Sequence, residues 1–420
     1  MKRFVGLGLL WLVMGCAGCD QAATNKHQAN SSPDSPPPDS PSSDSSSKVA
    51  LRLGAVLGGD ADDFDRASVP RAFDFPRDHG AHPRFRSEWW YLTCPLRDAS
   101  GAEYGLQFTV FRQGLRPMEV PRRPQDTAES NNPAALWRTG QIYMAHAALT
   151  DVQRQEHTEA TRLSRGHPEL AGVSTAQDEA AFAVYLEDWR LQAPDGSLET
   201  LQLKLRHRDE GSDVAAQGRR GFDVQLALTP EKPVVLQGDA GLSSKGGREA
   251  SYYYSMPRLR AHGELRSTPN GILLPVWGAC WFDREWSTSV LAPGVEGWDW
   301  LALQFDDGTE LMAFQLRSQQ ANPVRQAKQI DAVGQGVSVP SSQVEFIADR
   351  HWQDEVGVAW PVGWTVRIAG TNYLVRAAID DQRMRSSIPY WEGLVWVFDE
   401  SNQRIGQGYL EMTGYARPQD

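Results

Sequence analysis

Short stretches in which apolar and polar residues alternate make up most of the chain beyond residue 63. Residues 106–110 are an example, because they read Leu-Gln-Phe-Thr-Val. Alternation with a period of two is typical of a β-strand that has one buried face. Helical spacing is almost absent, and the best candidate for a helix is the short stretch 340–349. The pattern therefore predicts an all-β protein.

Two pairs of these runs are separated by sequences that favour tight turns. Residues 298–305 and 310–316 flank an Asp-Asp-Gly sequence, and residues 182–189 and 198–206 flank a Pro-Asp-Gly sequence. An Asp-Gly pair between two apolar runs is a strong signal for a β-hairpin. Many short strands at this spacing predict antiparallel sheets that close into barrels or sandwiches.

The chain also contains a weak internal similarity. Residues 88–112 and 298–317 each read as a Trp-rich strand, a polar turn and a second apolar strand that ends in Arg. A duplicated β unit on each side of about residue 260 would explain the similarity. The alternative is a chance match of two short segments. We expect one domain at 64–260 and a second at 261–420.

The N-terminus has the features of a bacterial lipoprotein signal. Lys2 and Arg3 precede an apolar run at 4–14, which is far shorter than the roughly 20 residues that cross a bilayer. The sequence Leu-Val-Met-Gly-Cys that ends at Cys16 resembles a lipobox, so Cys16 is the expected lipidation site. Cys19 and an ordinary cleavable signal are the alternatives.

A tether is expected between this signal and the folded part. Residues 30–48 are almost entirely Ser, Pro and Asp, which offer no apolar surface to offset the cost of ordering. We expect residues 1–15 to be removed as a signal peptide and residues 16–63 to be disordered. The protein is therefore expected in the cell envelope, anchored to a bacterial membrane by lipid chains.

Composition narrows the choice of partners. The chain has 53 acidic against 42 basic residues and a net charge of -11, so nucleic acid is not an expected partner. Its 15 Trp residues are an unusually large number of rings, which must be buried or offered to an apolar ligand. A hydrophobic small molecule is the expected ligand.

The richest segment for chemistry is residues 271–286. In a strand, Trp277, Ala279, Trp281 and Asp283 point to one face. Burial beside rings would raise the pKa of Asp283 and keep the carboxyl protonated as a general acid. A charged strand end that faces water is the alternative.

Four more residues are candidates because they are polar or aromatic groups within apolar runs: Glu88, Trp90, His146 and Tyr254. A core histidine that is simply hydrogen-bonded is the alternative for His146. No spacing rule for a metal site joins Glu88 to the histidines, and no phosphate-binding or dinucleotide fingerprint is present, so we expect neither a metal nor a cofactor.

Cys94 and Cys280 are the cysteines of the globular part. An exported chain meets an oxidising compartment, so a disulfide between them is one alternative. We expect instead two small buried hydrophobic residues in separate domains.

Eight motifs occur in order along the chain: DHGAHP at 78–83, EWWY at 88–91, HAALTD at 146–151, YYYS at 252–255, WFDREW at 281–286, GWDW at 297–300, YWEG at 390–393 and GYLEMTGY at 408–415. With these motifs the chain resembles the hydroxyneurosporene synthase family, also called carotenoid 1,2-hydratases, and especially its AttH-like, lipocalin-like secreted branch. This resemblance implies two lipocalin-like antiparallel β-barrel domains packed together.

The resemblance also implies roles for particular residues. In the hydratases, an Asp in a Tyr-x-Asp strand motif is thought to protonate a terminal isoprenoid double bond, aided by an upstream His-Tyr-Trp cluster. Asp283 matches that Asp, Trp281 stands where the Tyr would be, and the cluster region contains Tyr254 but no His or Trp. AttH-like members look like companions of ABC-type exporters, which makes such an exporter an implied partner.

Three functions are consistent with these observations. The first is an envelope lipoprotein that binds an isoprenoid- or lipid-like ligand, with Trp277, Trp281, Trp90, Glu88 and His146 as ligand contacts. The second is a cofactor-free hydratase, or a related secreted hydrolase, in which Asp283 is the acid and Trp281 and Tyr254 stabilise a carbocation. The third is a structural lipoprotein, which predicts no cavity of ligand size, about 300 Å³ or more.

Overall fold

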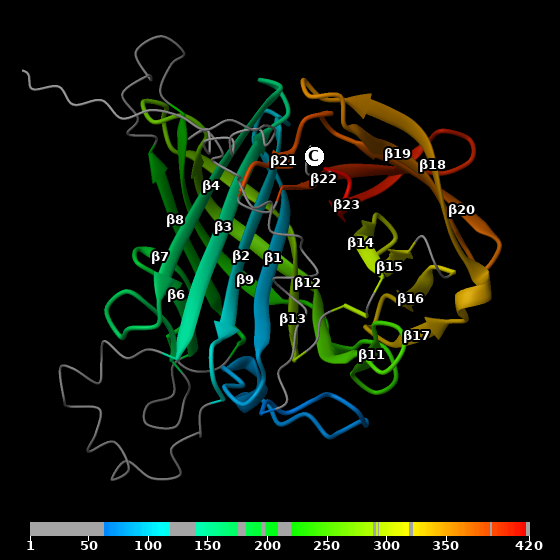
Figure 1. Cartoon of the computed structure of the whole chain (residues 1–420). Coiled ribbons are helices and arrows are strands. Elements are labelled where there is room, and N and C mark those ends of the chain that lie inside the picture. The colour runs from blue at the N-terminus through cyan, green and yellow to red at the C-terminus, as the bar shows by residue number, and fades with distance from the viewer. Residues whose placement is uncertain are drawn as a thin grey trace, which may run out of the picture. The chain divides into compact units, whose positions relative to one another are not determined.

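The computed structural model describes residues 63–117, 140–174, 182–194, 198–208, 220–288, 291–292, 294–318, 322–386 and 389–416 (Figure 1). This part of the chain forms two antiparallel β-sheets and contains no α-helix; its helical elements are the 3-10 turns η1 (Arg77–His79) and η4 (Ser341–Gln343). The predicted all-β class is confirmed. No helix of the described part is long and apolar enough to cross a membrane. The expected signal peptide, Cys16 and almost all of the tether lie outside the described residues.

The first sheet has 13 strands, coloured blue to green in Figure 1. In chain order they are β1 (Ser87–Asp98), β2 (Glu103–Gly114), β3 (Gln141–Asp151), β4 (Glu156–Arg165), β5 (Ala171–Ser174), β6 (Phe182–Leu186), β7 (Trp189–Ala193), β8 (Leu201–Arg208), β9 (Gly221–Pro230), β10 (Val235–Leu236), β11 (Leu242–Ser244), β12 (Ala250–Arg266) and β13 (Leu274–Ser287). Their order across the sheet is β4-β3-β2-β1-β13-β12-β9-β8-β7-β6-β5, and β10 and β11 also pair with β12.

The second sheet has 10 strands, coloured yellow to red in Figure 1. They are β14 (Val295–Phe305), β15 (Glu310–Ser318), β16 (Val324–Ile330), β17 (Gly336–Val339), β18 (Val344–Gln353), β19 (Ala359–Ile368), β20 (Thr371–Ala377), β21 (Arg383–Met384), β22 (Tyr390–Phe398) and β23 (Arg404–Thr413). Their order is β17-β16-β15-β14-β23-β22-β20-β19-β18, and β21 pairs with β22.

The hairpins predicted from the sequence are present with one change. β14 and β15 pair as expected, and Gly308 in their turn has a φ of 83°, which glycine adopts without strain. Residues 182–189, expected to be one strand, instead contain β6, a turn at Glu187 with a φ of 57° and the first residue of β7, which pairs with β6. This turn lets Leu186 and Trp189 lie opposite each other with both side chains buried.

Two other expectations about elements need correction. The helix expected at 340–349 is wrong: a single 3-10 turn there leads directly into β18, whose burial alternates with a period of two at its start. The expected domain division at 260 and 261 falls inside β12, and the change from the first sheet to the second lies after Ser287. β12 and β13 complete the first sheet because β13 is the strand that pairs with β1.

Strands at the centre of each sheet are buried on both faces. On β1, Trp90 and Tyr91 are adjacent in sequence and both buried, although they point in opposite directions. Trp90 joins the core enclosed by the first sheet, whereas Tyr91 packs with Trp300 and Phe314 of the second sheet. The two sheets therefore pack against each other through a second core.

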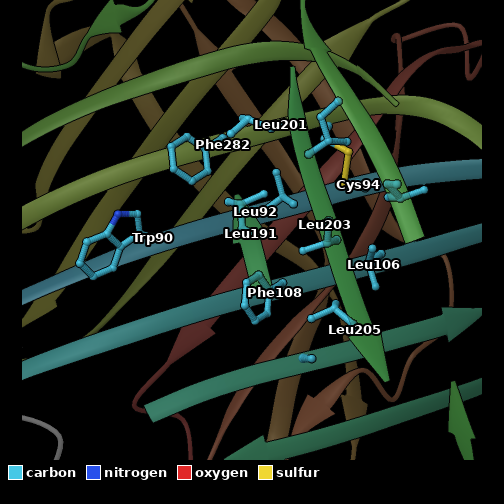
Figure 2. Close-up of a cluster of buried hydrophobic side chains, with 14 of the residues drawn as sticks. Trp90, Leu92, Cys94, Leu106, Phe108, Leu191, Leu201, Leu203, Leu205 and Phe282 are labelled. Carbon is cyan, nitrogen blue, oxygen red and sulfur yellow. A yellow bond between two sulfur atoms is a disulfide. The ribbon is translucent and has the colours of Figure 1, made fainter. Parts of the chain in front are cut away.

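Cys94 and Cys280 form a disulfide within the core of the first sheet, so the expectation that they stay unpaired in separate domains is wrong (Figure 2). Their Cα atoms are 4.1 Å apart. β1 and β13 are neighbours in one sheet, and Thr93 lies opposite Trp281, which brings the two cysteines into the same register position. The pairing could not be read from the sequence because the cysteines are 186 positions apart.

Candidate active site

Asp283 is a buried carboxyl on β13 at the contact between the two sheets. The Tyr253 hydroxyl donates to its Oδ2 atom at 2.6 Å, and the Ser255 hydroxyl and the Trp281 indole N–H donate to Oδ1 at 2.5 and 2.6 Å. Burial raises the pKa of Asp283 from 3.8 to about 7, against the opposing effect of these three hydrogen bonds. A carboxyl that titrates near neutral pH can donate or accept a proton under physiological conditions.

Asp283 lines a cavity of about 90 Å³ between the sheets. Its walls are largely aromatic and aliphatic and come from both sheets and from the segment between β13 and β14: Trp89, Phe111, Leu291, Trp298, Trp300 and Phe314. This volume is below the roughly 300 Å³ of a typical ligand pocket, so it suits the terminal group of a molecule and not a whole lipid.

Two glutamates from the second sheet, which we did not predict as site residues, line the same cavity. Glu392 on β22 lies directly opposite Glu411 on β23, and Glu392 is 1% exposed. Among the described residues, neither carboxyl oxygen of Glu392 has a hydrogen-bond partner in normal geometry, although the Tyr91 and Tyr390 hydroxyls act to lower its pKa. Burial, together with the neighbouring carboxyl of Glu411, outweighs them and raises the pKa of Glu392 well above its usual range. Burial also raises the pKa of Glu411, to about 8.

A signal for one of these glutamates is present in the sequence. Residues 390–398 are apolar or aromatic except for one Gly and Glu392. A carboxyl in the middle of such a run is costly unless it has a partner or a role. Applied to residues 390–398, that rule singles out Glu392 from the sequence alone.

The fourth carboxyl of the cavity is paired. The Lys245 ammonium lies 2.8 Å from Glu285 Oε1, 4.6 Å from the centre of the Phe314 ring and 5.5 Å from that of Tyr253. Both Lys245 and Glu285 are buried and both line the cavity. This ion pair neutralises Glu285, whereas no cation of the described residues forms an ion pair with the other three carboxyls.

Trp281 and Trp277, predicted to share a face with Asp283, have different positions. Trp281 is buried and holds Asp283 through its indole N–H. Trp277 is 39% exposed and lies under the Arg97 guanidinium, away from the cavity. Six residues of strand separate it from Asp283 by about 20 Å, so a shared face does not bring it to the site. Trp277 therefore does not contact this cavity, which corrects the prediction.

Tyr254, Trp90 and Glu88 point away from the cavity, into the core of the first sheet. The Tyr254 hydroxyl lies 2.5 Å from His79 Nδ1, and the Trp90 indole donates to the His79 carbonyl at 2.9 Å. Tyr253, Trp89 and Tyr91 occupy the cavity side instead because neighbouring residues of a strand face opposite sides.

Glu88 belongs to a buried ion network in that core. Its carboxylate pairs with Arg112 and Arg284, and no atom of the three side chains reaches solvent. Burial alone would raise the pKa of Glu88, but the two guanidinium groups lower it. Glu88 therefore stabilises the first sheet and does not contact this cavity.

His146 lies on β3 beside the cavity but does not line it. Its Nδ1 atom is 2.7 Å from the Tyr390 hydroxyl, and burial lowers its pKa to about 4, so the ring is neutral at physiological pH. In the part of the chain that the structure describes, Nε2 of His146 has no hydrogen-bond partner. Among the described residues no group of His, Cys, Asp and Glu is arranged to hold a metal ion.

Comparisons with known proteins agree with this architecture. A family model described as AttH-like matches residues 66–415. The crystal structure of an AttH protein from Nitrosomonas europaea is 31% identical, with a TM-score of 0.69 over 84% of this chain and 100% of that chain. The crystal structure of kievitone hydratase from Nectria haematococca is 15% identical, with a TM-score of 0.56 over 84% of this chain and 96% of that chain. No curated protein matches the chain.

Proposed function

The chain belongs to the AttH-like family, and from that premise we propose that it is a cofactor-free, hydratase-type enzyme with Asp283 as its general acid. The observation that carries the proposal is the fully buried Asp283 carboxyl, which titrates near neutral pH and faces an aromatic cavity. Kievitone hydratase shares the fold, so the architecture is compatible with hydration chemistry.

The reaction we propose adds water across a carbon–carbon double bond. Protonated Asp283 donates its proton to one carbon of the double bond, and the π electrons form the new C–H bond. The other carbon becomes a cation, which the rings of Trp298 and Trp300 stabilise through their faces. Water adds its oxygen to this carbon and loses a proton, which returns to the Asp283 carboxylate. The product is an alcohol, and the enzyme is regenerated.

The shape of the cavity supports a substrate with a small branched end. A volume of about 90 Å³ accommodates a terminal isoprenoid unit, whereas the remainder of a longer molecule would lie outside it. A hydrolase that uses a Ser or Cys nucleophile is less well supported, because neither residue type lines the cavity in the described part of the chain.

A second candidate function is binding of a hydrophobic ligand without turnover. The apolar walls of the cavity favour it, since Leu291 and Leu316 join the rings there. We also propose that the protein works in the cell envelope, attached by a lipid on Cys16, because the N-terminal sequence resembles a lipobox. The resemblance to AttH-like proteins supports an ABC-type exporter as its partner.

The test is hydration of a panel of isoprenoid alkenes in isotopically labelled water, followed by mass spectrometry of the products. Asp283→Asn keeps the shape of the side chain but has no acidic proton, so we expect turnover to fall by roughly 10²–10⁴-fold. Asp306→Asn is the matched control, because Asp306 is exposed in the β14–β15 turn. Equal turnover by the two variants would refute the acid role. If the wild-type protein shows no turnover but retains an extractable hydrophobic ligand, the binding function holds; if it shows neither, a structural role holds.

A further inference from the structure

The cavity holds more carboxyl groups than it has cations to pair with them. Four carboxyls line it, from Asp283, Glu285, Glu392 and Glu411. Lys245 pairs with Glu285, and no Lys, Arg or His of the described residues forms an ion pair with the other three. Glu392 has the fewest partners, because it is buried and no described residue forms a hydrogen bond of normal geometry with either carboxyl oxygen. Buried carboxyls without compensating partners are costly and are retained where a ligand or a reaction uses them.

The same cavity has the walls that recognise a cation. Rings from Trp89, Trp298, Trp300 and Phe314 surround it. A cation over an aromatic face is attracted by the ring quadrupole, and such aromatic cages bind quaternary ammonium groups. When these carboxyls are ionised, they favour a cation in the cavity and repel an anion.

We propose that the cavity binds an alkylated ammonium group carried on an apolar molecule, placed among the aromatic rings and facing Glu392 and Glu411. The proposal deepens the proposed function, because a positive charge also arises in the cation that Asp283 would create by protonating a double bond. It does not require turnover, since a stable ammonium compound can occupy the site without reacting.

Lys245 supports the proposal from within the chain. Its ammonium already lies over the Phe314 ring and pairs with a carboxylate of the same cavity. The wall therefore accommodates one alkyl ammonium group. Glu392 and Glu411 offer the same chemistry to a second one, and the volume of about 90 Å³ suits a head of trimethylammonium size.

Binding of such a ligand is linked to pH. Burial raises the pKa of Glu411 to about 8 and that of Glu392 well above its usual range, so both carboxyls hold protons at low pH. A cation favours their ionised forms, and its binding therefore releases protons and strengthens as the pH rises through about 8. The other titratable groups that face this pair come from the loop before β12 and from strands β1, β12, β13, β22 and β23. They are Lys245, Tyr91, Tyr253, Asp283, Glu285, Tyr390 and Tyr409.

The experiment compares choline with its uncharged carbon isostere, in which a tert-butyl group replaces the trimethylammonium group. Both are titrated into the purified full-length protein by calorimetry, in buffers of different ionisation enthalpy. We expect choline to bind about tenfold more tightly than the isostere at about pH 9, with release of protons, and this preference to disappear at about pH 5. Equal affinities at both pH values, or no binding of choline at either, would overturn the proposal.

Variants test whether the carboxyls of Glu392 and Glu411 cause the preference for choline. Glu392→Gln should remove the preference for choline, whereas Glu400→Gln, an exposed position in the turn of the same β22–β23 hairpin, should keep it. If Glu392→Gln fails to give the circular dichroism spectrum of the wild type, Glu411→Gln takes its place. A preference that persists without these carboxyls contradicts the proposal.

The experiments distinguish failure of the hydratase function from failure of the ammonium-binding site. Loss of turnover in Asp283→Asn together with equal affinities for the two probes would leave the hydratase function and remove the cation site. A preference for choline without any turnover would support the ammonium-binding site and contradict the hydratase function.

Discussion

Replacing Asp283 by Asn should change how the stability of the fold depends on pH. In the folded protein, burial raises the pKa of Asp283 to about 7, whereas the unfolded chain has an ordinary carboxyl that titrates near 3.8. Between these values the unfolded state has lost the proton that the folded state retains. The free energy of unfolding of the wild type therefore falls as the pH rises from about 4 to about 7. The Asp283→Asn variant lacks this part of the fall, because an amide does not titrate in this range.

The size of the effect follows from the difference between the two states. A rise in pKa from 3.8 to about 7 corresponds to about 4 kcal/mol of lost stability once the pH exceeds both values. Asn also alters the hydrogen bonds with Tyr253, Ser255 and Trp281, because its amide offers a donor where the carboxylate offers only acceptors. That cost is nearly independent of pH. The prediction therefore concerns the slope and not the absolute stability.

Urea unfolding of the wild type and of Asp283→Asn at a series of pH values between about 4 and 9 measures this slope. We expect the wild type to lose about 4 kcal/mol relative to the variant across that range. Asp306→Asn should run parallel to the wild type, because its carboxyl is exposed. Parallel curves for the wild type and Asp283→Asn would show that Asp283 is already ionised in the folded protein, and the acid role would lose its basis.

Two further predictions concern the cysteines. Replacing Cys94 and Cys280 by Ala together should lower the free energy of unfolding by about 5 kcal/mol, because the disulfide no longer restricts a loop of 186 positions in the unfolded chain. Urea unfolding of the wild type with and without reductant measures this contribution. Equal stability in both conditions would contradict the prediction. Metabolic labelling with a fatty acid should label the wild type but not Cys16→Ser. Undiminished labelling of the variant would indicate that Cys19 carries the lipid. An unlabelled wild type would exclude a lipoprotein.

The alternation of apolar and polar residues predicted most of the strands, but it did not predict which face of a strand packs against the other sheet. It correctly places Asp283 and Trp281 on one side of β13. It fails for the tyrosines of β12, where Tyr253 reaches Asp283 and Tyr254 points to His79. Strands that are buried on both faces carry apolar residues at every position, so the sequence does not mark the side that faces a cavity.

Other parts of the site depend on contacts between distant segments. Glu392 and Asp283 meet only because the second sheet packs on the outer face of the first. The disulfide likewise depends on the pairing of β1 with β13, which local propensity does not specify. Packing of this kind is decided by the whole fold, whereas hairpins such as β14–β15 are decided by their own turn residues.

The pairing of β1 with β13 also determines when the first sheet can form. Ser87 lies opposite Ser287, so β1 waits for a partner that is synthesised about two hundred residues later. Contacts of such long sequence separation slow folding, and until β13 arrives one edge of β1 exposes unpaired N–H and C=O groups to other chains. A chain interrupted before β13 is therefore expected to aggregate, and the part of the protein that precedes β14 is a folding unit only once its last strand is in place.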